Sequence, residues 1–516
     1  MLTRRTVLAG AAVSALAAPA LLRAQTAWRH YPFSLGIASG DPSADGFVIW
    51  TRLAPEPLEP GGGMGTGVVP VAYEVASDDA FRTVVANGGG LARPELGHAV
   101  HVEVAGLQPD RPYWYRFEQG GERSVRGRAH TLPAPGASPQ RLRFGVAGCQ
   151  NYEDGLFTAH RHLAREDLHF VYHYGDYIYE YRGDPLRPGR GEGGIFQPVR
   201  QHLGQLLYTL DDYRRRYAQY KMDADLQRAH AAHAFFVAND DHEVDNNWVS
   251  LIEQEGAPPE LFALRRAAAF QAWYEHMPVR RRSLPRQGAI QVFRSARWGD
   301  LAELNFLDTR QFRTDQPCGD GFKPACPEVR AQQAQVLGAE QEAWLARNLA
   351  SGDARWNVLA QQVMMMSVDR RRTPDEAPEK VLNLDSWAGY EAPRTRLLNR
   401  MAGLSNVVVL TGDEHQNWAG LLHDGRDRPV AVELVATSIA AGGDGQDLRP
   451  GSDTILANNP QLRFVNDQRG YIVCDVGHEE WRTDFMVVDR VSTPGGSLTK
   501  RQSITVARGR PQLSLA

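Results

Sequence analysis

The chain has 516 residues, of which 42% are apolar and 23% are charged, and its formal net charge is −4. This length exceeds one ordinary compact core, so at least two domains are expected. The composition is that of a globular protein, which argues against a disordered or fibrous chain, and the small net charge gives no nucleic-acid-binding footprint.

The first 24 residues have the layout of an export signal. Arg4 and Arg5 precede an Ala-rich apolar run from Val7 to Leu22, which is shorter than the roughly 20 residues that cross a bilayer core. Paired arginines predict export of the folded protein by the twin-arginine (Tat) machinery. We therefore expect a periplasmic or secreted protein with no stable membrane span after signal cleavage. The alternative is an uncleaved membrane anchor.

Residues 30–135 are predicted to form a small antiparallel β-sandwich of the immunoglobulin or fibronectin type. The stretches 100–104 and 113–117 alternate apolar and polar side chains with a period of two, and 106–110 between them has turn composition. Short strands joined by such turns are typical of this architecture. The Pro-rich stretch 133–139 is predicted to be the linker to the next domain.

From residue 140 to residue 510, strands alternate with helices, which predicts an α/β domain. The expected strands are 144–147, 170–174, 233–238, 304–307, 356–360 and 407–410, and the expected helices are 156–168 and 339–349. Cys318 and Cys326 lie in a Pro/Gly-rich loop of this domain and could form a disulfide in an oxidising compartment. Cys474 lies in an apolar run and is interpreted as a buried strand cysteine.

Four of the expected strands end in polar loops. Ligand sites gather at the carboxyl ends of strands in α/β sheets, and Asp, His, Cys and Tyr supply oxygen, nitrogen and sulfur ligands, so a metal site is expected there. The loops read Gly148-Cys149-Gln150-Asn151, Gly175-Asp176-Tyr177-Ile178-Tyr179-Glu180, Asn239-Asp240-Asp241-His242-Glu243 and Gly412-Asp413-Glu414-His415.

Each of these residues also has a structural interpretation when it is taken alone. Cys149 could be a buried filler, Asp176 could cap a turn, and Tyr179 could be a core residue. Asp241 could be a solvated loop charge, and His415 a buried histidine with satisfied nitrogens. The recurrence of the pattern at four separate strand ends favours the metal site.

The loops resemble the strand-end motifs of the metallophosphoesterases, which include the purple acid phosphatases, and most closely those of PhoD-type alkaline phosphatases. The resemblance covers roughly residues 30–500. It implies an α/β (α+β) metallophosphoesterase-like β-sandwich flanked by helices, preceded by the N-terminal β-sandwich. Further matching strings are Cys149-Gln150-Asn151-Tyr152, Leu307-Asp308-Thr309-Arg310-Gln311, Gly442-Gly443-Asp444-Gly445 and Asn466-Asp467-Gln468-Arg469-Gly470-Tyr471.

The resemblance implies a site for ferric iron (Fe³⁺) and calcium (Ca²⁺), with zinc (Zn²⁺) less favoured. Cys149, Asp176 and Tyr179 match the positions that hold iron, and Asp176 matches the bridge to calcium. The calcium side is completed by positions that match Asp241, Asp413 and His415. The implied function is hydrolysis of small-molecule phosphate monoesters, and of diesters, by a metal-activated hydroxide.

Two further residues are candidates for catalysis. His242 could donate a proton to the phosphate or the leaving oxygen, and Arg310 could make a bidentate phosphate contact or a structural salt bridge. The sequence departs from the family at two positions. Asn239 stands where the family often has Trp, which affects the aromatic wall of the pocket, and Glu414 stands where a small apolar residue is common and is expected to point away from the metals.

Three other functions compete with a phosphatase. A phosphodiesterase or phospholipase D-like hydrolase would use the same loops. An exported oxidoreductase fits the export signal, but the sequence lacks a strand-preceded Gly-x-Gly-x-x-Gly, a Cys-rich cluster motif and a Cys-x-x-Cys-His haem site. A non-catalytic surface-binding protein fits the N-terminal sandwich but leaves the four polar loops without a role.

Export provides a direct test of the N-terminal motif. Replacing Arg4 and Arg5 together by Lys should block export, because the twin-arginine route requires the paired arginines. Fractionation followed by immunoblotting should then find the variant in the cytoplasm and the parent protein outside it. Export of the variant at the parental level would contradict the twin-arginine assignment.

Overall fold

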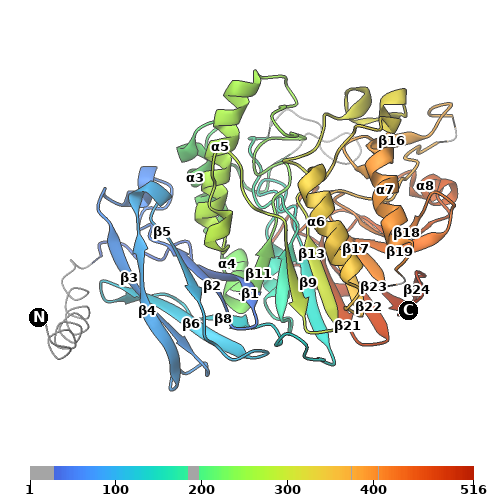
Figure 1. Cartoon of the computed structure of the whole chain (residues 1–516). Coiled ribbons are helices and arrows are strands. Elements are labelled where there is room, and N and C mark those ends of the chain that lie inside the picture. The colour runs from blue at the N-terminus through green and yellow to red at the C-terminus, as the bar shows by residue number, and fades with distance from the viewer. Residues whose placement is uncertain (1–27, 184–196, 374, 405) are drawn as a thin grey trace, which may run out of the picture.

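The computed structural model describes residues 28–183, 197–373, 375–404 and 406–516 (Figure 1). The predicted signal at residues 1–24 lies outside these ranges. Among the helices that are described, none is long and apolar enough to cross a bilayer.

The largest sheet has ten strands and runs through most of the molecule. Its central strands β9, β10, β11 and β1 are parallel, and the remaining neighbours are antiparallel. In spatial order the strands are β24 (Ser514–Leu515), β23 (Leu498–Ala507), β22 (Glu480–Val488), β21 (Gly470–Val476), β9 (Leu142–Ala147), β10 (Phe170–His173), β11 (Ala234–Val237), β1 (Ile37–Ser43), β2 (Gly46–Arg52) and β5 (Ala99–Val104).

A second sheet of seven strands faces the first. Its strands β13, β15, β17 and β19 are parallel to one another. The order is β12 (Arg294–Trp298), β13 (Ala302–Phe306), β15 (Trp356–Ala360), β17 (Val407–Thr411), β19 (Pro429–Val435), β18 (Asn417–His423) and β20 (Leu462–Asn466). A two-stranded ribbon of β14 (Phe322–Pro324) and β16 (Val381–Asn383) lies apart from both sheets.

Burial on both faces explains why the strand sequences are continuous apolar runs. Val408 and Leu410 belong to the core between the two large sheets, whereas Val407 and Val409 belong to the core beneath the helices. Sheets covered on both faces read this way, in contrast to half-exposed sheets. Between the sheets, the rings of Phe236 and Phe306 stack with centroids 4.4 Å apart.

Helices cover the outer faces of this two-sheet core. α6 and α7 pack on the seven-stranded sheet through an apolar cluster of their own (Figure 1). The helices are α2 (Thr158–Leu163), α3 (Leu210–Lys221), α4 (Ala224–Ala232), α5 (Pro259–His276), α6 (Gly338–Ser351), α7 (Glu391–Met401) and α8 (Ser452–Asn458). The helix expected at 156–168 is shorter in the structure and ends at Leu163. After Leu163 the chain continues in tight turns, in one of which the Glu166 N–H donates to the backbone oxygen of Leu163.

The N-terminal region is a β-sandwich that shares one of its sheets with the rest of the molecule. Strands β1, β2 and β5 pack on a separate five-stranded sheet through a core that includes Phe47 and Tyr115. β1 also pairs in parallel with β11, where Ser39 lies opposite Ala234. An antiparallel sandwich joined to the next domain by a linker was predicted, and the structure adds a parallel pairing through which β1 covers β11 of the larger sheet. The five-stranded sheet consists of β4 (Val84–Ala92), β3 (Val69–Ala76), β6 (Pro112–Gln119), β7 (Glu122–Arg123) and β8 (Gly127–His130).

The cysteine predictions are confirmed. Cys318 and Cys326 form a disulfide, and Cys149 and Cys474 are free and buried. Cys474 lies in β21, as the apolar run around it indicated.

Tyr174 joins the two large sheets at the carboxyl ends of their strands. This residue follows β10, and its hydroxyl donates to the backbone oxygen of Thr437, 2.9 Å away. Its ring lies against Gly148 after β9 and Gly412 after β17, and a Cβ added to either glycine would lie only 2.3 Å or 2.1 Å from a ring carbon. The two glycines therefore allow the polar loops of both sheets to come together.

Gly412→Ala should destabilise the protein, because the new methyl group would overlap the Tyr174 ring. Overpacking of this kind costs about 1–3 kcal/mol, which urea unfolding can measure. The matched control is Gly403→Ala, where no atom lies within 4 Å of the added Cβ. The control should unfold at the same urea concentration as the parent protein or slightly higher, and an equal loss in both variants would contradict the close contact.

Candidate metal centre

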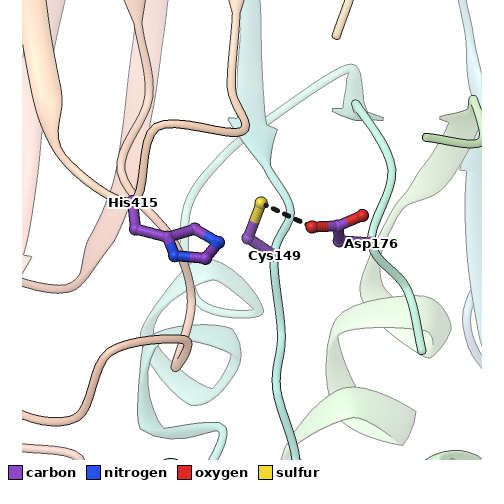
Figure 2. A group of neighbouring side chains, drawn as sticks. All are labelled: Cys149, Asp176 and His415. Carbon is purple, nitrogen blue, oxygen red and sulfur yellow. Dashed lines mark hydrogen bonds between the residues drawn. The ribbon is translucent and has the colours of Figure 1, made fainter. Parts of the chain in front are cut away.

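Three of the predicted ligands lie against one another in the buried space between the sheets. The Cys149 thiol donates to Oδ2 of Asp176 at 3.3 Å, and the Tyr179 hydroxyl donates to the same oxygen at 3.0 Å. The Tyr179 oxygen also lies 3.2 Å from Nε2 of His415. Figure 2 shows the thiol of Cys149 between Asp176 and His415. The loops after β9, β10 and β17 thus place sulfur, oxygen and nitrogen donors at one point.

A group of carboxylates continues from this point. Asp176 has a donor atom within 4.8 Å of donor atoms of Asp241 and His242, and Asp241 is also grouped in this way with Asp240 and Asp413. Asp176 therefore belongs to two donor groups, as a bridging carboxylate must. The structure brings all six sequence-predicted ligands into one continuous cluster.

The backbone of the cluster is strained. The φ angles of Cys149, Asp176, Asp413 and His415 are 51°, 54°, 65° and 52°. Left-handed conformations at residues other than glycine cost about 1–3 kcal/mol each and concentrate at functional sites. Backbone bonds between the loops hold this geometry, including the Cys149 N–H to the oxygen of Gly175 at 3.1 Å. The strain turns the side chains of four predicted ligands toward a common centre.

Glu243 ties the loop after β10 to the loop after β11. Its carboxylate is buried and accepts three backbone N–H groups, from Asp176 at 3.1 Å, Tyr177 at 2.5 Å and Asp240 at 2.7 Å. Glu243 stands in the same loop as Asp241 but was not predicted to be a functional residue. Glu243 thereby fixes the backbone of the two loops that contain the predicted ligands Asp176 and Asp241.

Burial makes the cluster electrostatically unfavourable for anions. Burial raises the pKa of Asp176 and of Asp413 well above the usual range, and neighbouring carboxylates raise them further. Burial also raises the pKa of Asp240 to about 6, against the opposing effect of Arg310. The thiol of Cys149 likewise has a pKa raised by burial. A cation within the cluster would favour the ionised forms that ligation requires.

Orphaned polar atoms show that the residues fit bound metal ions. Within the described part of the chain, Oδ1 of Asp176, Oδ2 of Asp240 and Oδ1 of Asp241 are buried and have no hydrogen-bond partner. Buried polar atoms are normally paired, so these oxygens indicate a ligand. Thiolate and imidazole suit iron or zinc, whereas several carboxylates suit calcium.

His242 lies at the edge of the cluster with a fixed orientation. Its Nδ1 lies 2.7 Å from Oε2 of Glu180, and its Nε2 lies 4.0 Å from Oδ2 of Asp241. Burial opposes protonation, but Glu180, Asp241 and Asp176 together raise the pKa of His242 well above its usual range. The ring lies tilted against the Tyr179 ring, with centroids 4.1 Å apart. The geometry leaves Nε2 directed toward the carboxylates.

Arg310 is completely buried and binds carboxylates with two of its three nitrogens. Nε donates to Asp240 at 2.6 Å, and Nη1 donates to Asp385 at 2.8 Å. Nη2 lies 3.4 Å from Oδ1 of Asp241 and has no hydrogen-bond partner among the described residues. The salt bridges predicted as one alternative are therefore present, and Nη2 faces Asp241 without a hydrogen bond. Asp385 itself was not predicted, because no local sequence pattern marks it.

The two departures from the family pattern have different surroundings. Glu414 pairs with Arg370 at 2.6 Å and belongs to none of the donor groups around the site. Asn239 is buried, and neither its amide oxygen nor its nitrogen has a hydrogen-bond partner within the described ranges. Glu414 thus points away from the cluster, as expected.

The two-sheet core flanked by helices is a purple acid phosphatase-like fold. The solved structure of purple acid phosphatase PPD1 from yellow lupin (Lupinus luteus) seeds shares this fold. The TM-score is 0.56 at 13% identity, over 92% of this chain and 74% of that one.

Sequence comparison identifies the family within this class. Residues 144–485 match the PhoD-like phosphatase family model, and residues 17–133 match the model of the PhoD-like phosphatase N-terminal domain. The chain is 46% identical to alkaline phosphatase D of Bacillus subtilis (strain 168) over 489 residues, which cover 94% of this chain and 82% of that protein. A solved structure of PhoD superposes with a TM-score of 0.91 at 45% identity, over 95% of this chain and 93% of that one.

The chain belongs to the PhoD-like phosphatase family, which confirms the resemblance inferred from the motifs. It is therefore a phosphatase-family hydrolase, and the oxidoreductase and the non-catalytic binding protein are set aside.

Glu243→Gln should weaken metal binding by about 10- to 100-fold, a typical effect of losing a residue that orients ligands. In the variant, the NH₂ group of the Gln side chain would face backbone N–H groups that the Glu243 carboxylate now accepts. Two donors cannot pair, so the loops after β10 and β11 would shift. Elemental analysis after dialysis measures the loss.

Glu433→Gln is the matched control. Glu433 is also buried and accepts the backbone N–H groups of Met365 and Met366, each at 2.7 Å, but it lies outside the donor groups. This variant should lose stability and keep its metal. Equal metal loss in both variants would show that Glu243 has no special part in the site.

Proposed function

We propose that the chain is an exported alkaline phosphatase that hydrolyses small phosphate monoesters, and diesters, at the cluster of Cys149, Asp176, Tyr179, Asp241, Asp413 and His415. The observation that carries the proposal is the gathering of these donors, with orphaned buried oxygens, in a chain of the PhoD-like family.

The donor set supports ferric iron on Cys149, Asp176 and Tyr179, because thiolate and phenolate suit a trivalent transition metal. Asp241 and Asp413, together with Asp176, would hold calcium, for which carboxylate oxygens are suited. His415, which was predicted for the calcium side, lies instead in the donor group of Cys149 and Asp176. Zinc is the less favoured substitute. When bound, the ions supply positive charge that ionises a water molecule near neutral pH and stabilises charge on the phosphate.

The remaining steps fall to side chains of the chain itself. Nδ1–H of His242 donates to Glu180, and the raised pKa of His242 keeps the ring protonated, so Nε2 carries a second proton that can pass to the leaving oxygen. Nη2 of Arg310 offers an N–H to a phosphate oxygen, while Asp240 and Asp385 keep the guanidinium from turning. The burial of both groups excludes bulk water and strengthens these contacts.

The location and the N-terminal module are part of the same proposal. The twin-arginine motif supports a periplasmic or secreted enzyme, and the Cys318–Cys326 disulfide is consistent with an oxidising compartment. We assign the N-terminal sandwich to the immunoglobulin or fibronectin type on the basis of its two packed sheets of short strands.

Hydrolysis of p-nitrophenyl phosphate and bis(p-nitrophenyl) phosphate by the purified protein tests the activity and separates monoesters from diesters. Asp176→Asn should lower kcat/KM by more than about 100-fold, because the bridging carboxylate serves two ions. Asp424→Asn, at a surface turn where Asp424 accepts the N–H groups of Arg426 and Arg428, should keep full activity. Unchanged activity in Asp176→Asn would overturn the proposal.

Colour tests the identity of the metal. Iron bound by the Tyr179 phenolate should give a visible charge-transfer band, which zinc and calcium cannot give. Tyr179→Phe should abolish or shift this band and remove most activity. Tyr177→Phe loses only the 2.7 Å contact with His230, outside the donor groups, and should keep the band. A colourless, iron-free enzyme that is fully active with zinc would contradict the iron assignment alone.

A further inference from the structure

A loop closed by the disulfide lies beside the cluster. The disulfide closes residues 318–326. Together with the three residues before them, they form a loop, 315–326, that is bound to the segment after β11 at two points. Oδ2 of Asp320 accepts from Nδ2 of Asn247 at 2.7 Å, and Nε2 of Gln316 donates to the backbone oxygen of Asn247 at 2.6 Å. The backbone N–H of Asn247 donates to Oδ2 of Asp241 at 2.9 Å. The disulfide loop thus reaches the predicted ligand Asp241 through one residue.

The same amide of Gln316 reaches the other side of the site. Nε2 also donates to Oδ1 of Asp385 at 2.7 Å. Asp385 binds Arg310 at 2.8 Å and Arg313 at 2.8 Å. An amide nitrogen has two hydrogens, and in Gln316 they serve the Asp241 side and the Arg310 side of the cluster.

We propose that Gln316, two residues before Cys318, is a positioning residue of the phosphatase site, and that the disulfide, by closing residues 318–326 next to it, helps to hold it there. This inference rests on the proposed function. Gln316 sets the backbone of Asn247, and with it one oxygen of Asp241, while it fixes the carboxylate that orients Arg310. A single side chain thereby fixes the positions of the proposed metal ligand Asp241 and of Arg310, the proposed phosphate-binding cation, relative to each other.

The disulfide restricts a loop that has few other structural constraints. The loop has little regular structure, since it contains only the 3-10 turn η4 (Pro317–Gly319) and the short strand β14. Phe322 and Lys323 at its tip are exposed. Cys318 and Asp320 both have left-handed backbones, with φ angles of 59° and 60°. Covalent closure limits the freedom of such a loop more effectively than its few apolar contacts can.

The test compares two substitutions by methionine in the same loop. Gln316→Met keeps the length of the side chain and removes both donors. Lys323→Met is the matched control, because Nζ of Lys323 donates only to Cys318 O and Gly319 O within the loop. The measurements are kcat and KM for p-nitrophenyl phosphate, the calcium and iron content after dialysis against stepwise lower calcium chloride, and the melting temperature.

Gln316→Met should lower kcat by about ten- to a hundred-fold and release calcium at a higher calcium chloride concentration than the parent protein. Lys323→Met should have the kcat of the parent protein and release calcium at the same calcium chloride concentration, each within about twofold. A fall in melting temperature alone, with kcat and metal retention unchanged, would show that Gln316 is only a structural brace and would overturn the inference. Equal effects of both variants would overturn it as well.

A second variant covers the case in which Gln316→Met does not fold. Cys318→Ser with Cys326→Ser opens the loop but keeps every hydrogen-bonding side chain, and it should shift calcium retention and kcat in the same direction. If this variant kept the kcat and the calcium retention of the parent protein, the disulfide would have no part in positioning Gln316. Metal retention is measured without substrate, so it still decides the inference if the parent protein hydrolyses no phosphate ester, an outcome that would overturn only the proposed function.

Discussion

Burying several carboxylates together is unfavourable unless positive charge accompanies them, and this constraint governs the whole molecule. Asp176, Asp240 and Asp241 are buried and Asp413 is half-buried, all at the carboxyl ends of strands from both sheets. Within the described residues, Arg310 contacts Asp240 and Asp241, and the His242 ring lies 4.0 Å from Asp241. We propose that bound metal ions supply the charge that remains and, with it, the chemistry that a phosphatase needs.

The rest of the fold serves to hold this unfavourable cluster in place. The glycines beside Tyr174 allow the loops of the two sheets to approach, and the backbones of four predicted ligands accept left-handed conformations. Glu243 and the loop that carries Gln316 then bind the backbone around the ligands. Two large apolar cores beneath the site supply the stability that offsets this strain.

Much of the site could be predicted from the sequence because its ligands follow directly after strands that are apolar on both faces. Cys149, Asp176 and Asp413 each stand within two residues of the last strand residue or its glycine. Asp385 and Gln316 could not be found in this way, since they contact residues 69 to 75 positions away and stand in no recognisable motif. The joining of β1 to β11 was missed for the same reason, because strand pairing over nearly 200 residues leaves no local pattern.

Crystals of the purified protein, with diffraction data collected on either side of the iron absorption edge, test the central claim most directly. The account predicts an anomalous iron peak bounded by the Cys149 sulfur, the Tyr179 oxygen and the Asp176 carboxylate. A second ion without an iron signal should lie among Asp176, Asp241 and Asp413. An absence of metal from this cluster, or metal bound only at the separate group of Asp245, Glu253 and Glu255, would contradict it.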